Sequence, residues 1–500
     1  MSPQHTTPSG RRLVKRLAVA LVIIAALAFA ALAVLREQWR EPENVVPPIK
    51  AAAAGTQPAY PYELVPADPR LDFPAAEGRQ RDMDSDTWFL EGVLEGQHSG
   101  RRFSFIVVYY VSRLYDLVPF NFYSLTFYDL DQPSYGTFTR YDVGKMRASA
   151  GYLDLHLPID GQEALWTTAL DGDGKLVPFT YRIDLPGVDQ QGRDMHLRAD
   201  VRVVNPPVAV GADTYNGLIT VLRQPNTYSY FQTGVEFDGV LSWGDYSEPV
   251  KGHLGHLDRQ MFPLFSGVNN SRDGRDLSHE WRTFFLDNGM DFSSWRQFDR
   301  TQHNAEYAYS GATVFQAGKG ARYVDDIVYE NLSYLRVEDP PVQPLLPARA
   351  DVLYFPDRHR LRSAALDLDL EVEPIIEAPL LAFPVEYMHG PVLLHGTQAG
   401  QPVKGIGSFE LTLHLYRDFE LVTVLADSVR HLPMEARRST SPPMDEVLAD
   451  IALIGAAIKR GDHSSARATA DGLVRKHLRR FSPPYRNHLL QILEDLLEAL

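Results

Sequence analysis

Short runs in which hydrophobic and polar residues alternate dominate the chain between Trp88 and about Leu425. The alternation is strict in Met195–Val204 and Leu366–Val372, which is typical of strands with one buried face. Other short extended runs are Arg102–Val111, Phe122–Tyr128, Thr220–Arg223, Ala312–Gln316 and Ser408–Tyr416. This pattern predicts a mainly β protein.

Turn signals separate these runs, for example the Asp-Gly-Asp-Gly sequence of Asp171–Gly174 and the Asn288-Gly289 pair. About 340 residues of such a pattern exceed one ordinary sheet, so two β domains are the better interpretation. We place them at residues 84–235 and 236–430.

The spacing of apolar residues becomes helical after Pro442-Pro443. Three such segments, Asp445–Arg460, His463–Arg480 and Tyr485–Leu500, are separated by Gly461-Asp462 and by Pro483-Pro484. We predict a short α-helical appendage over residues 444–500 that docks a protein partner. The alternative is a tetratricopeptide-like repeat module, but three short helices do not provide a second repeat.

The N-terminal region has a different character. Leu17–Leu35 contains no charged, polar, Gly or Pro residue, and the basic residues Arg11, Arg12, Lys15 and Arg16 precede it. Such a length and such flanks predict a transmembrane helix with a cytoplasmic stub, residues 1–16, and with the bulk of the chain in the periplasm. The expected location is the bacterial inner membrane. A cleaved signal peptide is the alternative, because Ala31-Leu32-Ala33 resembles a cleavage site.

Residues 36–83 are rich in Pro and Ala and lack periodicity, which indicates a tether between the membrane and the β domains. The chain of 500 residues contains no cysteine, which excludes disulfides, thiolate metal sites and cysteine nucleophiles. Its net charge of −15, together with aromatic residues that lack basic companions, argues against nucleic acid as a partner. The same negative charge disfavours binding to anionic lipid headgroups, so any lipophilic ligand would be held by apolar contacts.

Three ordered segments resemble the AttH / carotenoid 1,2-hydratase family. Asp86–Phe89, followed by a Gly-Arg-Arg turn, is similar to the family's opening E-W-W-Y strand. Val250–Gln260 and Trp281–Met290 resemble its G-x-x-W-x-D-[HR]-[EQ] segment and the strand after it, and Gly405–Thr412 is similar to its late G-x-G-x-x-E-x-T strand. The run Asn226–Gln232 resembles the tyrosine-rich end of the first domain.

The resemblance covers roughly residues 84–425 and implies two lipocalin-like antiparallel β-barrel domains in tandem. The sequence departs from the family at His256, where the family has tryptophan, and at Thr87, where it has the first aromatic residue of its pair.

The segment around Asp258 carries the candidate chemistry. In a strand, His256, Asp258 and Gln260 project from the same face, and Gly252 and Gly255 leave room for a ligand or a bulge. A carboxyl among apolar neighbours holds its proton near neutral pH, as protonation of an alkene requires. The resemblance implies Asp258 as the acid, with His256 and Gln260 orienting it or a water molecule, and no cofactor. The alternative is a simple β-turn in which Asp258 pairs with Arg259 or a backbone N–H.

Five further residues are candidate ligand contacts: Trp88, Phe89, Tyr230, Trp281 and Glu410. Large aromatic residues are more often core than binding residues, and Glu410 fits either an inward polar contact or a solvated position. We predict no metal site. His253 and His256 face opposite sides of a strand, Asp171–Gly174 lacks the spacing of a calcium loop, and Thr283 takes the place of the second histidine of an H-E-x-x-H motif.

The sequence thus supports two functions. The first is a membrane-anchored, periplasm-facing protein that binds or transfers a lipophilic molecule, with an envelope ABC transporter as a partner. The second is a cofactor-independent hydratase or cyclase that acts on an isoprenoid-like alkene by acid catalysis. The interface between the domains or a barrel mouth would hold the ligand in either case.

Overall fold

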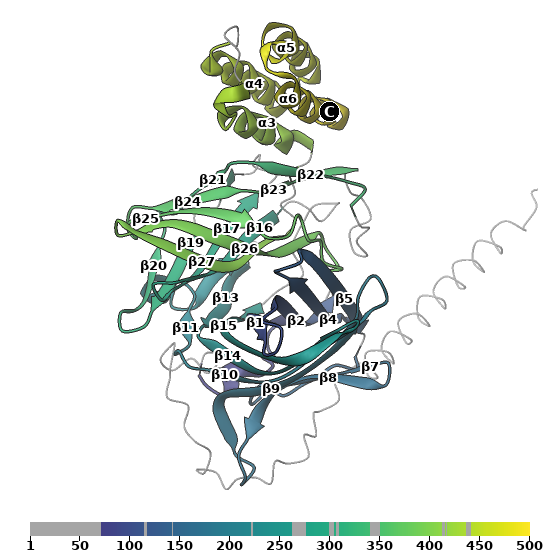
Figure 1. Cartoon of the computed structure of the whole chain (residues 1–500), viewed down its shortest axis with the longest axis vertical. Helices are drawn as coiled ribbons and strands as arrows, with labels where there is room; N and C mark the ends of the chain where they lie inside the picture. Colours follow the sequence, from purple (N-terminus) through teal and green to yellow (C-terminus); the bar gives the residue numbers. More distant parts are fainter. Residues whose placement is uncertain are drawn as a thin grey trace, which may run out of the picture.

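The computed structural model describes residues 72–114, 118–142, 144–221, 224–262, 277–299, 305–306, 310–340, 351–412, 416, 418–436 and 442–500. Two strongly curled antiparallel sheets are followed by C-terminal helices, which confirms a mainly β protein with a helical appendage (Figure 1). The predicted transmembrane helix Leu17–Leu35, the stub before it and most of the tether lie outside these residues. No helix within the described ranges is long and apolar enough to cross a membrane.

The first sheet is built around β1, the first long strand, which pairs with β2 on one side and β15 on the other. In spatial order its main path is β5 (Ser134–Asp142), β4 (Asn121–Asp129), β2 (Arg102–Leu114), β1 (Ser85–Gly96), β15 (Tyr246–Phe262), β14 (Val235–Trp243), β10 (Asp194–Val203), β9 (Leu176–Val188), β8 (Gln162–Leu170), β7 (Asp154–Ile159) and β6 (Arg147–Ala148). Four shorter or branching strands join it: β3 (Val118–Pro119), β11 (Val208–Ala209), β12 (Leu218–Val221) and β13 (Gln224–Gln232).

The second sheet repeats this plan, because its first strand again pairs with its last. Its order is β20 (Gly320–Val324), β19 (Gly311–Gln316), β17 (Met290–Asp299), β16 (Leu277–Leu286), β27 (Gln401–Thr412), β26 (Tyr387–Gln398), β25 (Leu368–Pro374), β24 (His359–Ser363) and β21 (Val328–Asn331), with β18 (Ala305–Glu306) at the side. A separate ribbon consists of β22 (Tyr334–Glu338) and β23 (Val352–Pro356). The predicted second domain begins at residue 236, and its first two strands, β14 and β15, pair within the first sheet.

The C-terminal helices pack on the β22–β23 ribbon (Figure 1). The helices are α3 (Leu421–Arg430), α4 (Met444–Lys459), α5 (His463–Lys476) and α6 (Pro483–Ala499), and the short ones elsewhere are η1 (Ala75–Glu77), α2 (Ala212–Tyr215), η3 (Asp418–Glu420), η4 (Met434–Ala436) and η5 (Leu478–Arg480). Arg336 Nε donates to Asp495 Oδ2 at 2.7 Å, and Tyr354 donates to the same oxygen at 2.6 Å. Helix α3 falls inside the range predicted as β, because its Val and Thr residues favour strands while its buried Leu421, Val424 and Leu425 follow helical spacing.

Strand β10 shows the predicted alternation of buried and exposed positions, whereas β1 and β4 are buried on both faces. On β1, Trp88 and Leu90 point into the core of the first sheet, and Phe89 lies on the opposite face. The second sheet covers that opposite face, and side chains from both sheets, including Tyr128 and Tyr387, form a shared apolar cluster there. The two sheets are thus joined through a buried interface, and a cavity lies within it.

A bulge in β15 sets the register at this interface. Val93 of β1 pairs with Leu254 and Glu95 pairs with Lys251, so Gly252 and His253 form an irregular step in the ladder. A side chain at Gly255 would collide with the ring of Phe237, which shows that this glycine makes room for a core aromatic residue and not for a ligand. After the bulge, β15 pairs regularly with β1 up to Phe262.

Candidate active site

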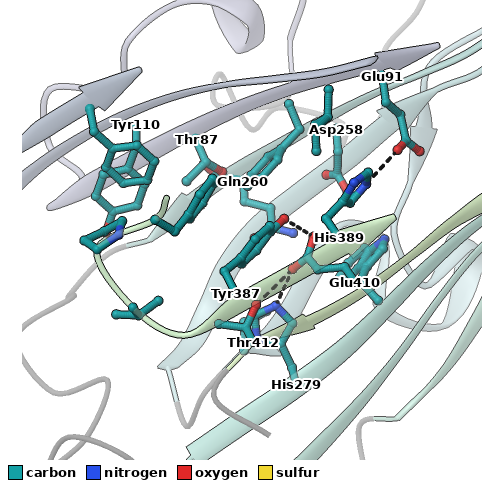
Figure 2. A pocket seen from close by; sticks show the side chains of 18 of the residues that line it. Thr87, Glu91, Tyr110, Asp258, Gln260, His279, Tyr387, His389, Glu410 and Thr412 are labelled. Carbon is teal, nitrogen blue, oxygen red and sulfur yellow. Dashed lines mark hydrogen bonds and ion pairs between the residues drawn. The ribbon is translucent and has the colours of Figure 1, made fainter. Parts of the chain in front are cut away.

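The cavity between the two sheets has a volume of about 180 Å³ and is lined mostly by apolar and aromatic side chains. Strands β1, β2 and β15 and the start of β4 form one wall, and β16, β26 and β27 form the other (Figure 2). The first wall contributes Thr87, Phe89, Glu91, Ile106, Tyr110, Ser112, Phe120, Phe122, Val221, His256, Asp258, Gln260 and Phe262. The second contributes His279, Trp281, Thr283, Phe383, Pro384, Val385, Tyr387, His389, Ser408, Glu410 and Thr412.

Strand register brings the polar groups of each wall together. On the first wall, Phe89 lies opposite Asp258 and Glu91 lies opposite His256. On the second wall, Trp281 lies opposite Glu410. Since β1 and β15 are the first and last long strands of the first sheet, as β16 and β27 are of the second, the pair of an aromatic residue and a carboxyl recurs at an equivalent position. The cavity therefore receives one such pair from each sheet.

Asp258 is buried and has few polar partners. Burial raises the pKa of its carboxyl above the ordinary value, the charge of Glu410 adds to this, and the nearby imidazole of His256 opposes it. His256 Nε2 lies 3.8 Å from Asp258 Oδ2, which is beyond hydrogen-bond distance. Neither ring nitrogen of His256 nor Oδ1 of Asp258 has a hydrogen-bond partner among the described residues. Buried polar atoms without partners are costly, so this pair is suited to a polar group of a ligand or to water.

Glu410 is slightly more exposed than Asp258 and has several hydrogen-bond donors. His279 Nε2 lies 3.0 Å from Glu410 Oε1, Tyr387 donates to Oε2 at 2.5 Å, and Thr412 donates to Oε1 at 3.2 Å (Figure 2). Burial acts to raise the pKa of Glu410, but these donors and the charge of His389 outweigh it and hold the pKa below its ordinary value. The pKa values of two carboxyls in one cavity are thus shifted in opposite directions. One carboxyl is suited to act as an acid and the other as a base.

Glu91 joins the two walls. Its Oε1 accepts a hydrogen bond from Ser408 at 3.0 Å, and its Oε2 lies 3.0 Å from His389 Nε2. Burial acts to raise the pKa of Glu91, and the hydrogen bond and charge of His389, with the charge of His256, lower it overall. On the far side of the same imidazole, the hydroxyl of Tyr128 lies 2.9 Å from Nδ1. These groups form a polar bridge between the sheets inside an apolar interface.

Six of the eight predicted site residues line the cavity: His256, Asp258, Gln260, Phe89, Trp281 and Glu410. The expectation that His256, Asp258 and Gln260 share one face of a strand is confirmed, and His253, which lies at the bulge, is exposed and does not line the cavity.

The structure places Trp88 and Tyr230 in the core of the first sheet and not in the cavity. Trp88 Nε1 donates to the carbonyl oxygen of Glu77 at 2.8 Å, and the guanidinium of Arg259 lies 4.0 Å from the centre of its ring. The physical reason is that adjacent residues of a strand face opposite sides, so Trp88 and Phe89 cannot both reach the ligand.

Sequence reasoning missed Glu91, His279, Tyr387 and His389. Two of them had a usable signal, since Glu91 follows Phe89 by two positions and His279 precedes Trp281 by two, so that each shares a face with a predicted contact. Tyr387 and His389 lie on β26, outside every motif, and only the pairing of β26 with β27 brings them to the site.

One group of side chains within the described ranges has the spacing of a metal site, namely Glu371, Glu373 and His395. These residues lie on β25 and β26, away from the cavity. Arg358 already forms ion pairs with Glu371 at 3.1 Å and with Glu373 at 3.2 Å. A surface ion-pair network accounts for this group. The Asp171–Gly174 segment forms the predicted hairpin turn, with Asp171 N–H donating to the carbonyl oxygen of Lys175.

No family model and no curated protein matches the sequence. Among solved structures, the chain is similar to a "putative AttH" from Nitrosomonas europaea, with a TM-score of 0.53 and 17% identity over 71% of this chain and 99% of that one. It is also similar to kievitone hydratase from Nectria haematococca, with a TM-score of 0.49 and 11% identity over 71% of this chain and 96% of that one. The first of these likenesses shows that the chain has the fold of the Nitrosomonas protein.

Proposed function

We propose that this chain binds a lipophilic molecule in the cavity between its sheets and adds water across a carbon–carbon double bond of that molecule. The observation that carries the proposal is a contrast within one aromatic cavity: Asp258 Oδ1 has no hydrogen-bond partner among the described residues, whereas Glu410 has three. A site for binding alone gains nothing from burying several carboxyl groups, because each one costs free energy in an apolar interior. Acid–base catalysis requires such groups.

Asp258 would act as the acid. Its carboxyl proton forms a bond to one carbon of the double bond, and the electron pair of the π bond becomes that C–H bond. The other carbon becomes a cation, which the faces of Phe89, Trp281 and Phe383 would stabilise. Phe383 and Tyr387 are stacked with ring centres 4.0 Å apart, so the two rings pack face to face in this part of the wall.

Water would then attack the cation, forming the C–O bond of an alcohol. The proton that this water loses passes to a carboxylate, either Glu410 or Glu91, since both keep an ionised form. That carboxyl group then passes its proton back to Asp258 through water, so the net reaction consumes one water molecule and neither gains nor loses a proton. His256 would orient the water, because its two ring nitrogens have no partner among the described residues.

The volume of the cavity limits the substrate. About 180 Å³ is smaller than the roughly 300–1,000 Å³ of pockets that enclose a drug-sized ligand. We therefore infer that the cavity receives the reactive end of a longer apolar molecule, of the isoprenoid-like class that the sequence suggested.

The test begins with the natural ligand. Lipophilic molecules that co-purify with the full-length chain are extracted and identified by mass spectrometry, and the matching alkene is incubated with the protein in H₂¹⁸O. We expect an alcohol that carries ¹⁸O, and no ¹⁸O alcohol with the Asp258→Asn variant. Retention of the alkene without any labelled alcohol would overturn the proposal.

That last outcome would support the second candidate, a carrier that binds and transfers the same molecule. The apolar lining of the cavity favours it, because it satisfies binding without chemistry. In this form of the proposal, Leu17–Leu35 anchors the chain in the bacterial inner membrane, the β domains face the periplasm, and an envelope ABC transporter supplies or accepts the ligand. Fractionation of cells that express the full chain tests the anchor: recovery in the soluble fraction would contradict it.

A further inference from the structure

The bridge between the sheets contains a histidine that the proposed reaction does not use. His389 lies on β26 of the second sheet and is held between Tyr128 of β4 and Glu91 of β1, both from the first sheet. All three side chains are buried. The contact therefore exists only while the two sheets are packed together.

The hydrogen bonds of Tyr128 determine where the protons of this imidazole lie. The hydroxyl of Tyr128 lies 2.7 Å from the backbone carbonyl oxygen of His389, and that oxygen has no proton to give. The single hydroxyl proton must therefore point to the carbonyl. The second contact of the same hydroxyl, to His389 Nδ1 at 2.9 Å, then requires Nδ1–H to donate to the tyrosine oxygen.

With Nδ1 protonated, only two arrangements remain for the contact between His389 Nε2 and Glu91 at 3.0 Å. Either Nε2 also carries a proton and donates to a carboxylate, or a neutral Glu91 donates to a bare Nε2. Because imidazole is the stronger base of the two groups, the proton between them lies on Nε2, and Glu91 accepts from both His389 and Ser408 as a carboxylate. The imidazole then carries both protons and a positive charge.

We propose that His389 is the positioning residue of this site, a doubly protonated imidazole that ties the two sheets across the cavity and places its charge between Glu91 and Glu410. The strand register supports the placement of this charge near Glu410, because His389 lies directly opposite Glu410 in the ladder of β26 and β27. The titratable groups near it from the surrounding strands are Glu91, Tyr128, Tyr135, His256, Tyr387 and Glu410. Among them, Glu91 and Glu410 are the anions that a cation at this place would stabilise.

This charge has a consequence for the acid. His279 and Tyr387 favour the ionised form of Glu410, a positive His389 adds to their effect, and the negative Glu410 in turn helps to raise the pKa of Asp258. Without the cation, Glu410 would take up a proton at a higher pH than in the wild type. The catalytic part of this role rests on the proposed function, whereas the protonation state of His389 does not.

The protonation state is tested in the full-length chain labelled with ¹⁵N in its histidines and purified in mild detergent. At pH 7.5, where a free imidazole is mostly neutral, we expect one buried histidine with protons on both ring nitrogens. The signal is assigned by its loss in His389→Gln. If that variant does not fold, the assignment comes from the shift that Tyr128→Phe causes. A His389 ring with one proton, on Nδ1, would overturn the proposal.

Two variants then separate the partners. Glu91→Gln removes the anion, so we expect His389 to lose its second proton at pH 7.5. The matched control is His395→Gln, which removes another histidine of the same strand that contacts a glutamate, Glu371 at 3.5 Å, but is exposed at the surface. The control should leave the His389 signal unchanged. A His389 that stays doubly protonated in Glu91→Gln would contradict the assigned pairing.

The positioning role is tested by the pH profile of the labelled-alcohol assay. We expect His389→Gln to move the alkaline limb to lower pH, because Asp258 loses its proton more easily once Glu410 is no longer held ionised. An unchanged profile in a folded His389→Gln variant would overturn this role. If no alcohol forms with the wild-type chain, the proposed function fails while the NMR result still decides the charge of His389.

Discussion

The two walls of the cavity present the same kind of pair in different surroundings. Phe89 and Asp258 on the first wall correspond in strand position to Trp281 and Glu410 on the second. The aromatic residues are comparable, and both carboxyls line the same cavity. The pKa of Asp258 is nevertheless raised, and that of Glu410 is lowered.

The difference comes from the neighbours of each carboxyl. Glu410 accepts hydrogen bonds from Tyr387 and Thr412 and contacts His279, whereas Oδ1 of Asp258 has no partner among the described residues. Burial alone disfavours charge, and donors to the ionised form reverse that effect. The comparison teaches that a repeated pair of an aromatic residue and a carboxyl can be divided into an acid and a base by changing the residues around it.

The largest expected effect comes from removing the acid. Asp258→Asn keeps the shape of the side chain but has no acidic proton, so we expect the rate of water addition to fall about 10²–10⁴-fold, the range of general acid catalysis. Ligand binding, measured as the amount of lipophilic molecule that co-purifies, should remain.

The control for this variant is Asp427→Asn. Asp427 lies on α3 and does not line the cavity, and burial raises its pKa as well. Its replacement should leave the rate unchanged. Equal losses in both variants would show that Asp258 acts through stability and not as an acid.

Replacing the ionised carboxyl should have a smaller effect. Glu410→Gln removes one of two carboxylates that can take the proton from water, and Glu91 remains, so we expect a loss near the lower end of that range, about 10²-fold. The variant also removes a negative charge that helps Asp258 to keep its proton. The alkaline limb of the rate profile should therefore move to lower pH, and a profile with unchanged limbs would contradict the coupling between the walls.

The sequence pattern was sufficient to predict most strands, the C-terminal helices and the shared face of His256, Asp258 and Gln260. Alternation identifies a face where one side of a strand is exposed, as on β10. It fails on β1, which is buried on both sides, and this is why Trp88 and Phe89 could not be told apart. The assignment of both to the ligand follows from this ambiguity.

The second wall could not be predicted, for a different reason. His389 and Glu410 meet only because β26 pairs with β27, and Glu91 meets them only because the two sheets pack face to face. No local spacing encodes contacts between residues about 300 positions apart. The pairing of β15 with β1, which places residues 246–262 in the first sheet, is of the same kind.

A moderate loss of stability is expected when a donor to the ionised carboxyl is removed. Tyr387→Phe takes one hydrogen bond from Glu410, and hydrogen bonds to charged groups contribute about 1.5–3 kcal/mol. The free energy of unfolding in urea should fall by a value in that range. Tyr141→Phe is the matched control, because Tyr141 donates to the carbonyl oxygen of Ala382 from an exposed position. It should cost clearly less, and equal costs would mean that Glu410 is not a special acceptor.

The smallest effects are the opposite pH slopes of stability that the two carboxyls should produce. The pKa of Asp258 is raised on folding, so its contribution is fully present below its unfolded pKa and is lost as pH rises through the folded value. The pKa of Glu410 is lowered, so its contribution is present above its unfolded pKa and is lost as pH falls through the folded value. As pH rises, the thermal midpoint of Asp258→Asn should therefore increase relative to that of the wild type. Glu410→Gln should instead be less stable than the wild type at neutral pH and approach it in acid. The division of the cavity into an acid wall and a base wall requires carboxyls that respond to pH in opposite directions. Equal pH dependence of the thermal midpoint in the two variants, relative to the wild type, would therefore contradict it.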